Sequence, residues 1–223
     1  MLVFRDTFDL RDVLERTRVV GYAFVASAIT EDLRAALVEE LSRLPLEVGD
    51  HERYPINQDS PNQVRQLHER AYRPLGHEDV PIGSELCRAL TELVTPLLHE
   101  YPELQGWQPS EIGYQRYRDT HDRISPHRDR VSDQTLSVTF TLFGSAHVRV
   151  HAPETNPPRY DRLREIDAFL TEPGTAMFLR APGFGNGVQI IHEVDPPLVA
   201  PRGILNLRKR ETILKPPSET RWR

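Results

Sequence analysis

His127, Asp129 and His192 are the side chains whose types and spacing point most directly to chemistry. His127 and Asp129 are separated by one residue, and in an extended chain residues two apart point to the same face. One imidazole and one carboxylate can therefore contact one ion from the end of a single strand. His192 ends the apolar run 188–191, and a neighbouring strand could bring its imidazole to the same ion. The three residues together predict a metal site.

This set of ligands would leave coordination positions open for other molecules. Two histidines and one carboxylate on one face of an ion form the facial triad that suits non-haem iron(II). A co-substrate and O2 could then both bind the metal directly. His77 and Asp79 repeat the spacing of the first pair, but they lie in a segment with proline and glycine and with no β pattern after it. The pair at 127 and 129 is therefore the better candidate.

Two arginines and a tyrosine could bind a second molecule beside the metal. Arg202 follows His192 by ten residues, and Arg208 follows six residues later. A guanidinium suits bidentate recognition of a carboxylate, so either arginine could hold the far end of a dicarboxylate that chelates the metal. Tyr117, ten residues before His127, could add a hydroxyl to the same carboxylate, or could be a core aromatic residue. The sequence leaves open which arginine contacts which carboxylate.

The N-terminal part of the chain is predicted to form elements that support this site. Residues 19–26 are rich in β-branched and aromatic residues and predict a buried strand. Leucines at helical spacing predict a helix over 31–44, and a second helix is expected to begin at a Ser84 cap and to run to about Leu97. Residues 45–83 show no clear period, so we expect a long loop region that has room for short elements and could act as a lid.

From about residue 111 the sequence consists of short runs with β character separated by turns, which predicts a sandwich or barrel. In the run 136–142, apolar residues alternate with hydroxyl residues, as in a strand with one buried face. The hydroxyl residues of this run, which could line a polar interior, are Ser137, Thr139 and Thr141. The β part would bring the two halves of the metal site together.

From Tyr114 to Arg208 the chain resembles the jelly-roll core of the iron(II)/2-oxoglutarate oxygenases. The segments that carry the resemblance are GYQRY, PHRD, TLSVTFTL, EPGTAMFL, VQIIH and RGILNLR. The order of the metal ligands, the glycine before TAMFL and the arginine after the last histidine follow that family. The pair Arg202-x5-Arg208 is similar to the ending of the AlkB-type demethylase branch, whereas Gln115-Arg116-Tyr117 stands where that branch has Asn-x-Tyr.

The resemblance implies a fold class as well as an activity. The fold would be α+β, with a double-stranded β-helix (jelly-roll) core over 111–212. Residues 1–110 would supply helices, loops and the lid, and the whole chain 1–223 would form one domain. The activity would be that of a dioxygenase that uses Fe(II), 2-oxoglutarate and O2, hydroxylates a C–H bond and releases succinate and CO2. Asp129 is retained where halogenating relatives have a small residue, so halogenation is not expected.

The resemblance also assigns roles to the candidate residues. The metal ligands would be His127, Asp129 and His192, and the co-substrate ligands would be Arg202, Arg208 and Tyr117. Each of these residues also has a plainer interpretation, as an ordinary strand residue, a solvated arginine or a core aromatic.

Composition limits the classes of partner and compartment. The net charge of -5 argues against a protein that binds nucleic acid over its whole surface. Cys87 is the single cysteine, so no disulfide forms within the chain and no cysteine-based zinc site is possible, which favours a reducing compartment. The first residues do not read as a signal peptide, and no run of ~18 apolar residues occurs, so we expect a cytoplasmic protein without a membrane span.

Four functions remain open from the sequence, one of which is hydroxylation of a protein side chain. A small-molecule hydroxylase, acting on an amino acid or a natural-product intermediate, fits the triad and the acidic chain. An AlkB-type nucleic-acid demethylase fits Arg202-x5-Arg208 and the basic C-terminus. A jelly-roll binding protein without turnover is the third, because a fold does not fix a function. Five arginines between residues 116 and 130 could form a solvated face or recognise an anionic substrate; the oligomeric state is left open.

Overall fold

The computed structural model describes residues 3–48, 64–129, 132–154 and 159–210. The helices are α1 (Leu10–Val20), α2 (Glu31–Arg43) and α3 (Pro81–Val94), with short 3-10 turns η1 (Thr95–Leu97) and η2 (Pro102–Leu104). The strands are β1 (Tyr22–Val25), β2 (Glu47–Val48), β3 (Gln66–Leu67), β4 (Glu69–Pro74), β5 (Glu111–Tyr117), β6 (Arg123–His127), β7 (Asp133–Pro153), β8 (Leu163–Thr171), β9 (Ala176–Arg180), β10 (Ile191–Val194) and β11 (Val199–Arg210). None of the helices in these ranges has the length and apolar character needed to cross a membrane.

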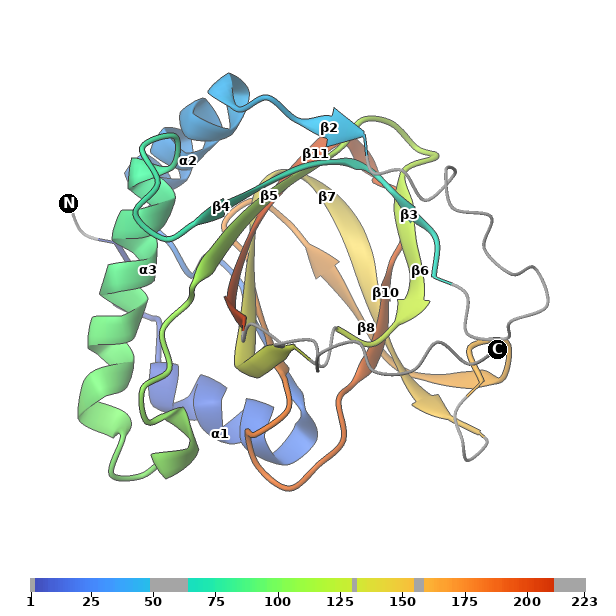
Figure 1. Cartoon of the computed structure of the whole chain (residues 1–223). Helices are drawn as coiled ribbons and strands as arrows, with labels where there is room; N and C mark the ends of the chain where they lie inside the picture. Colours follow the sequence, from blue (N-terminus) through green and yellow to red (C-terminus); the bar gives the residue numbers. More distant parts are fainter. Residues whose placement is uncertain (1–2, 49–63, 130–131, 155–158, 211–223) are drawn as a thin grey trace, which may run out of the picture.

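The strands form two antiparallel sheets that share β7. The first sheet runs β2-β4-β5-β11-β7-β9-β1, and the second runs β8-β7-β10-β6-β3. β3 and β4 follow each other in the chain and pair with β6 and β5 respectively, so this segment passes from the second sheet to the first. The result is a nearly closed barrel with three helices beside it (Figure 1). The predicted α+β fold with a jelly-roll core is confirmed.

β7 is long enough to take part in both sheets. Its first part pairs with β9 and β11, and its last part pairs with β8 and β10. Gly144 lies between the two parts and has a φ of +67°. A Cβ atom there would lie 2.5 Å from the carbonyl oxygens of Val199 and Pro201, so only glycine fits this close approach of β11.

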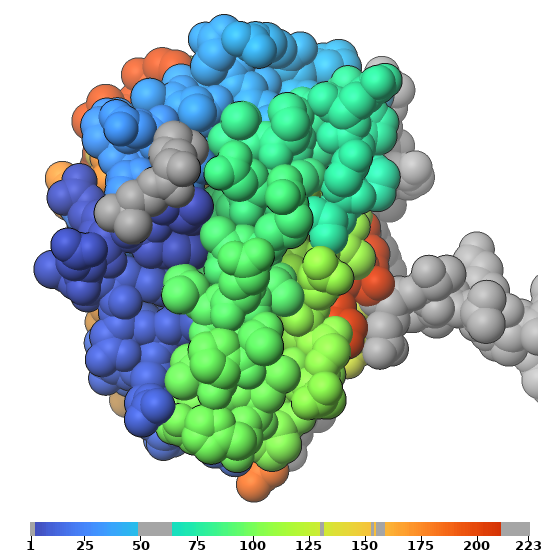
Figure 2. Space-filling view, turned by 90° about the vertical axis from the view of Figure 1, so that its left-hand side faces the viewer, coloured from blue at the N-terminus to red at the C-terminus, as the bar shows by residue number. Residues whose placement is uncertain are grey.

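The helices cover the outer face of the first sheet. Figure 2 shows α1, α2 and α3 side by side over this face. The apolar residues of β7 that pack in this core are Leu136, Val138, Phe140 and Leu142, and all are fully buried. The hydroxyl residues that alternate with them are buried on the opposite side of the strand, toward the inside of the barrel. The predicted alternation over 136–142 is confirmed.

The expected strand over 19–26 is wrong at its start, because Val19 and Val20 belong to α1 and β1 begins at Tyr22. Asp9 caps this helix: its Oδ1 atom accepts hydrogen bonds from the backbone N–H groups of Arg11 and Asp12 at 3.0 and 3.2 Å. Valine favours strands, but a capped helix with one buried face outweighs that preference.

The expected loop region over 45–83 contains short elements, which the expectation allowed, but its end is wrong because a helix begins before residue 84. Six residues of this segment form β4, which pairs with β5 along its whole length, and α3 begins at Pro81. The central stretch 49–63, which carried most of the lid expectation, lies outside the described residues. The segment shows no regular hydrophobic period because its strands are short, and not because it lacks secondary structure.

The start of α3 is held by a side chain from another helix. Ser84 does not cap it, because the Ser84 Oγ atom lies one turn inside the helix and accepts from the Gly76 N–H at 3.0 Å. Instead, the buried Glu40 carboxylate of α2 accepts from the N–H groups of Ile82 and Gly83 at 2.6 and 2.9 Å. A carboxylate at a helix N-terminus accepts hydrogen bonds from the free N–H groups and interacts favourably with the positive end of the helix dipole. A cap that comes from a distant part of the chain has no local sequence signal.

Candidate active site

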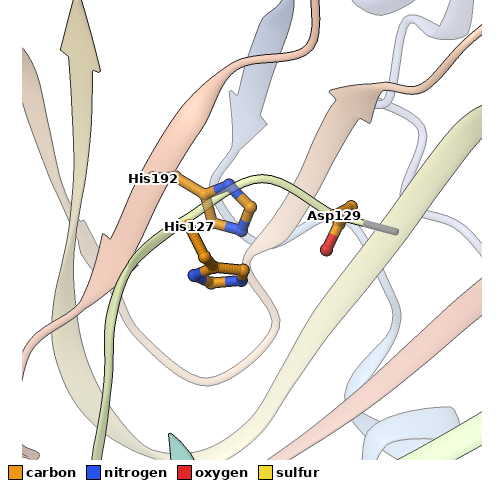
Figure 3. A group of neighbouring side chains, drawn as sticks. All are labelled: His127, Asp129 and His192. Carbon is orange, nitrogen blue, oxygen red and sulfur yellow. The ribbon is translucent and has the colours of Figure 1, made fainter. Parts of the chain in front are cut away.

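The three predicted metal ligands come together at the ends of two paired strands. His127 is the last residue of β6, and its register partner on β10 is His192. Their ring centroids are 4.3 Å apart. Asp129 follows β6 by two residues, and one ligand atom from each of the three lies within 4.8 Å of the others (Figure 3). This group could hold a metal ion, and it is the only such group of three among the residues that the structure describes.

Neighbouring groups orient two of these ligands. The Nδ1 atom of His127 lies 2.9 Å from the backbone oxygen of Ser125, so a proton on Nδ1 is donated to that carbonyl and Nε2 is left with a lone pair. The Nη2 atom of Arg208 donates to Oδ1 of Asp129 at 3.3 Å. Hydrogen bonds of this kind fix the tautomer of a histidine ligand and the position of a carboxylate ligand.

Electrostatics keep all three groups in the protonation state that binds metals. Burial, together with the neighbouring His192, lowers the pKa of His127 to about 3. Burial also lowers the pKa of His192. For Asp129, burial raises the pKa, but Arg208 and the two histidines outweigh it and bring the pKa to about 2. Two neutral imidazoles and one carboxylate at neutral pH are the forms that a divalent metal requires.

Arg202 lies in the same cavity and is 2% exposed. Its Nη2 atom donates to the hydroxyl groups of Thr141 and Thr171 at 3.3 and 3.0 Å. Its Nε and Nη1 atoms are buried and have no hydrogen-bond partner. A buried guanidinium held only by neutral hydroxyl groups is costly, and a carboxylate presented to its free N–H groups would offset that cost.

Tyr117 lies beside Arg202, as the predicted contact to one carboxylate would require. The two are register partners on β5 and β11, and the Arg202 guanidinium carbon lies 5.2 Å from the centre of the Tyr117 ring. The Tyr117 hydroxyl donates to Oε1 of Gln115 at 3.4 Å, and the Gln115 amide donates to the Tyr72 hydroxyl at 3.3 Å. Burial raises the pKa of Tyr117 to about 12, so its hydroxyl remains protonated.

Arg208 lies in the cavity too, but two carboxylates already surround it. Its guanidinium is 3.3 Å from Asp129 and 3.7 Å from the buried Asp133. Burial opposes its charge, but these two carboxylates outweigh burial and raise the pKa of Arg208. Its predicted contact with a co-substrate stays a prediction, while its contact with a candidate metal ligand is part of the structure.

All six predicted site residues therefore line one cavity of about 70 Å³. Further residues that line the cavity or contact Arg202 were missed, among them Gln115, Asn206 and Thr171. Asn206 could have been found, because it alternates with Arg202 and Arg208 along one strand and must share their face. Thr171 could not, because it reaches Arg202 from β8 and no local pattern marks it.

The second His-x-Asp motif forms no such site. Asp79 is paired with Arg73 at 2.9 Å, and its backbone N–H donates to the His77 ring at 3.1 Å. The two residues lie in the turn before α3 and make local contacts only. The preference for the pair at 127 and 129 agrees with this placement.

Comparison with known proteins identifies the fold. No family model matches the sequence, and no curated protein matches it significantly. Among solved structures, a prolyl-4-hydroxylase from Pseudomonas putida is similar with a TM-score of 0.65 and 15% identity, over 91% of this chain and 99% of that chain. OsALKBH1 has a TM-score of 0.54 and 12% identity, over 85% of this chain and 98% of that one. A 2OG-Fe(II) oxygenase family oxidoreductase from Burkholderia pseudomallei has a TM-score of 0.52 and 18% identity, over 93% and 94%. The chain has the fold that these proteins share, as the resemblance implied.

Proposed function

We propose that this chain is an iron(II)- and 2-oxoglutarate-dependent dioxygenase that hydroxylates a C–H bond of a small molecule. The observation that carries the proposal is a fully buried arginine with free N–H groups in the same cavity as the three candidate metal ligands. A metal alone would not need this arginine, and an anion alone would not need the triad. A dicarboxylate that binds both accounts for the two features together.

His127, Asp129 and His192 would hold the iron. The donor set, two imidazole nitrogens and one carboxylate, is the one that non-haem iron(II) oxygenases use and that leaves positions open. Asp129 is kept in place by Arg208, and His127 by the Ser125 carbonyl. Bound iron would supply the reaction of O2 with 2-oxoglutarate, in which one oxygen atom enters succinate, the other enters the substrate C–H bond, and CO2 leaves.

Arg202 would bind the carboxylate of 2-oxoglutarate that lies away from the metal. Its Nε and Nη1 atoms have no partner in the protein, so each can still donate a charge-assisted hydrogen bond to an anion. Thr141 and Thr171 hold the third nitrogen and so fix the plane of the guanidinium. Tyr117 packs against the guanidinium.

The charge of the chain favours a small substrate over nucleic acid, because a net charge of -5 gives little attraction for a polyanion. Two of the arginines between residues 116 and 130 are also paired with carboxylates, Arg116 with Glu69 and Arg118 with Asp122.

The decisive experiment measures turnover of 2-oxoglutarate. The purified protein, supplied with Fe(II), ascorbate, 2-oxoglutarate and air, should release succinate slowly without substrate and faster with the correct small molecule. His192→Ala should abolish the release, whereas His99→Ala, which changes an exposed histidine, should not. Succinate is measured by mass spectrometry. Binding of both iron and 2-oxoglutarate without any succinate would instead favour a binding protein, and stimulation by methylated oligonucleotides would favour the demethylase.

A further inference from the structure

The arginines between residues 116 and 130 do not behave as one charged face. Arg116 donates to Glu69 at 2.6 Å, and Arg118 forms a bidentate pair with Asp122 at 2.7 and 2.8 Å. Arg123 is exposed on β6, and Arg130 lies outside the described residues. Of the four described arginines, Arg128 alone lines the cavity that contains the triad.

Arg128 has an unusual place and an incomplete set of contacts. It stands between two candidate metal ligands in the chain and is half-buried. Its Nε atom is buried and has no hydrogen-bond partner, and it forms no ion pair with any residue that the structure describes. A buried guanidinium N–H without an acceptor is unfavourable, so a bound acceptor would stabilise this arrangement.

The charges that line the cavity also favour a bound anion. Among the residues that the structure describes, three arginines line it, and Asp129 is the only carboxylate on its wall. Arg208 is paired with Asp129, so two of the three cations have no anion on the wall. In the proposed function, iron and Arg202 would take the two ends of 2-oxoglutarate. Arg128 would then still face the cavity without an anionic partner.

We infer that the substrate carries an anionic group, a carboxylate or a phosphate, and that Arg128 binds it beside the metal. This inference rests on the proposed function and adds the chemical class of its substrate: a small acid rather than a neutral molecule. Arg128 lines the cavity that contains the triad, so the acid group would be held in the same cavity as the metal.

The first test uses small anions as probes. The protein is loaded with Fe(II) and saturating 2-oxoglutarate without oxygen, and acetate and methyl phosphate are titrated in separate calorimetric experiments. At least one anion should bind the original protein, and Arg128→Gln should weaken it about tenfold or more. Arg123→Gln removes an exposed arginine of the preceding strand, β6, and should leave the binding unchanged. The substrate group is assigned as a carboxylate if Arg128→Gln weakens acetate more, and as a phosphate if it weakens methyl phosphate more.

The second test compares small acids with their amides in the succinate assay. Free acids should stimulate succinate release more than the matched amides, and Arg128→Gln should raise the KM for an active acid about tenfold or more. The inference alone fails in two cases, provided that the original protein binds 2-oxoglutarate and releases succinate. In the first case neither anion binds, and in the second Arg128→Gln changes neither the anion affinity nor the KM. If the original protein neither binds 2-oxoglutarate nor releases succinate, the proposed function fails first. Arg128-dependent binding of an oligonucleotide, with no binding of either small anion, would overturn the small-acid assignment.

Discussion

Arg202 and Arg208 stand on the same face of β11, six residues apart, in opposite electrostatic surroundings. Arg208 has carboxylates at 3.3 and 3.7 Å, whereas Arg202 has only hydroxyl groups on one of its three nitrogens. A buried charge with an opposite charge beside it is stable without a ligand, but a buried charge with incomplete neutral partners is not. One strand thus presents an arginine that holds the protein's own metal ligand and an arginine that is free for an incoming anion.

Loss of Arg202 should have the largest effect on ligand binding. Arg202→Met keeps an unbranched side chain but removes the donors, so the affinity for 2-oxoglutarate should fall about 100-fold or more, near 3 kcal/mol. Calorimetry on the Fe(II)-loaded protein without oxygen measures this change. Arg202→Lys keeps the charge and should recover part of the affinity. Equal affinity in the original protein and Arg202→Met would remove Arg202 from the co-substrate site.

Loss of Arg208 should instead lower stability in the absence of any ligand. Arg208→Met leaves Asp129 without its cation and leaves Asp133 with Arg210 alone, at 3.4 Å, which should lower the free energy of unfolding by about 3 kcal/mol. Urea unfolding of the metal-free protein measures it. Arg202→Met in the same assay should be neutral or stabilising, because it removes a buried charge with unsatisfied N–H groups. The contrast between the two arginines is lost if both variants destabilise the protein equally.

Glu40 is a third buried ionisable residue and extends the comparison. Its partners are all neutral, like those of Arg202, but both of its carboxylate oxygens accept hydrogen bonds. It accepts from two backbone N–H groups and from the Tyr114 hydroxyl. Glu40→Ala should therefore lower the free energy of unfolding by about 2 kcal/mol, and Glu40→Gln by less. The affinity for 2-oxoglutarate should stay unchanged in both, since Tyr114 packs in the core below the helices. A changed affinity would mean that this core and the site are coupled.

Tyr117→Phe should give the smallest effect. It keeps the ring beside Arg202 and removes only the hydroxyl, so the affinity for 2-oxoglutarate should fall less than about fivefold, near 1 kcal/mol. The same calorimetric titration measures it. A loss as large as that of Arg202→Met would show that the hydroxyl, rather than the guanidinium, is the main contact to the carboxylate.

The sequence predicted the β part of the fold better than the N-terminal part. The strand 136–142 has a strict alternation because one face meets the helices and the other meets the barrel interior. α1 was missed because Val19 and Val20 favour a strand when they are read without the Asp9 cap. β4 was missed because its partner β5 lies far along the chain, and a strand of polar residues has no periodic signal.

The candidate site was predictable as a set of residues but not as a set of roles. Spacing was enough to select Arg202 and Arg208 together, because both side chains must leave β11 on one face. Their difference depends on Asp129, Asp133 and Thr171, which approach from other elements. Arg128 was one of five similar arginines in the sequence, and only tertiary structure separates it from the paired ones.

β7, the strand shared by both sheets, bears on which co-substrates the protein can accept. β10 and β11 both pair with β7, so His192 lies opposite Val150 and Gly203 lies opposite Phe143 on one continuous backbone. The span from the metal ligands to Arg202 is therefore set by a fixed number of residues along a single strand. Gly144 permits β11 to approach so closely that this span has little freedom to lengthen. In the proposed function, this fixed span would discriminate among dicarboxylates by length: a diacid with one extra methylene group would have to bend to fit between the metal and Arg202.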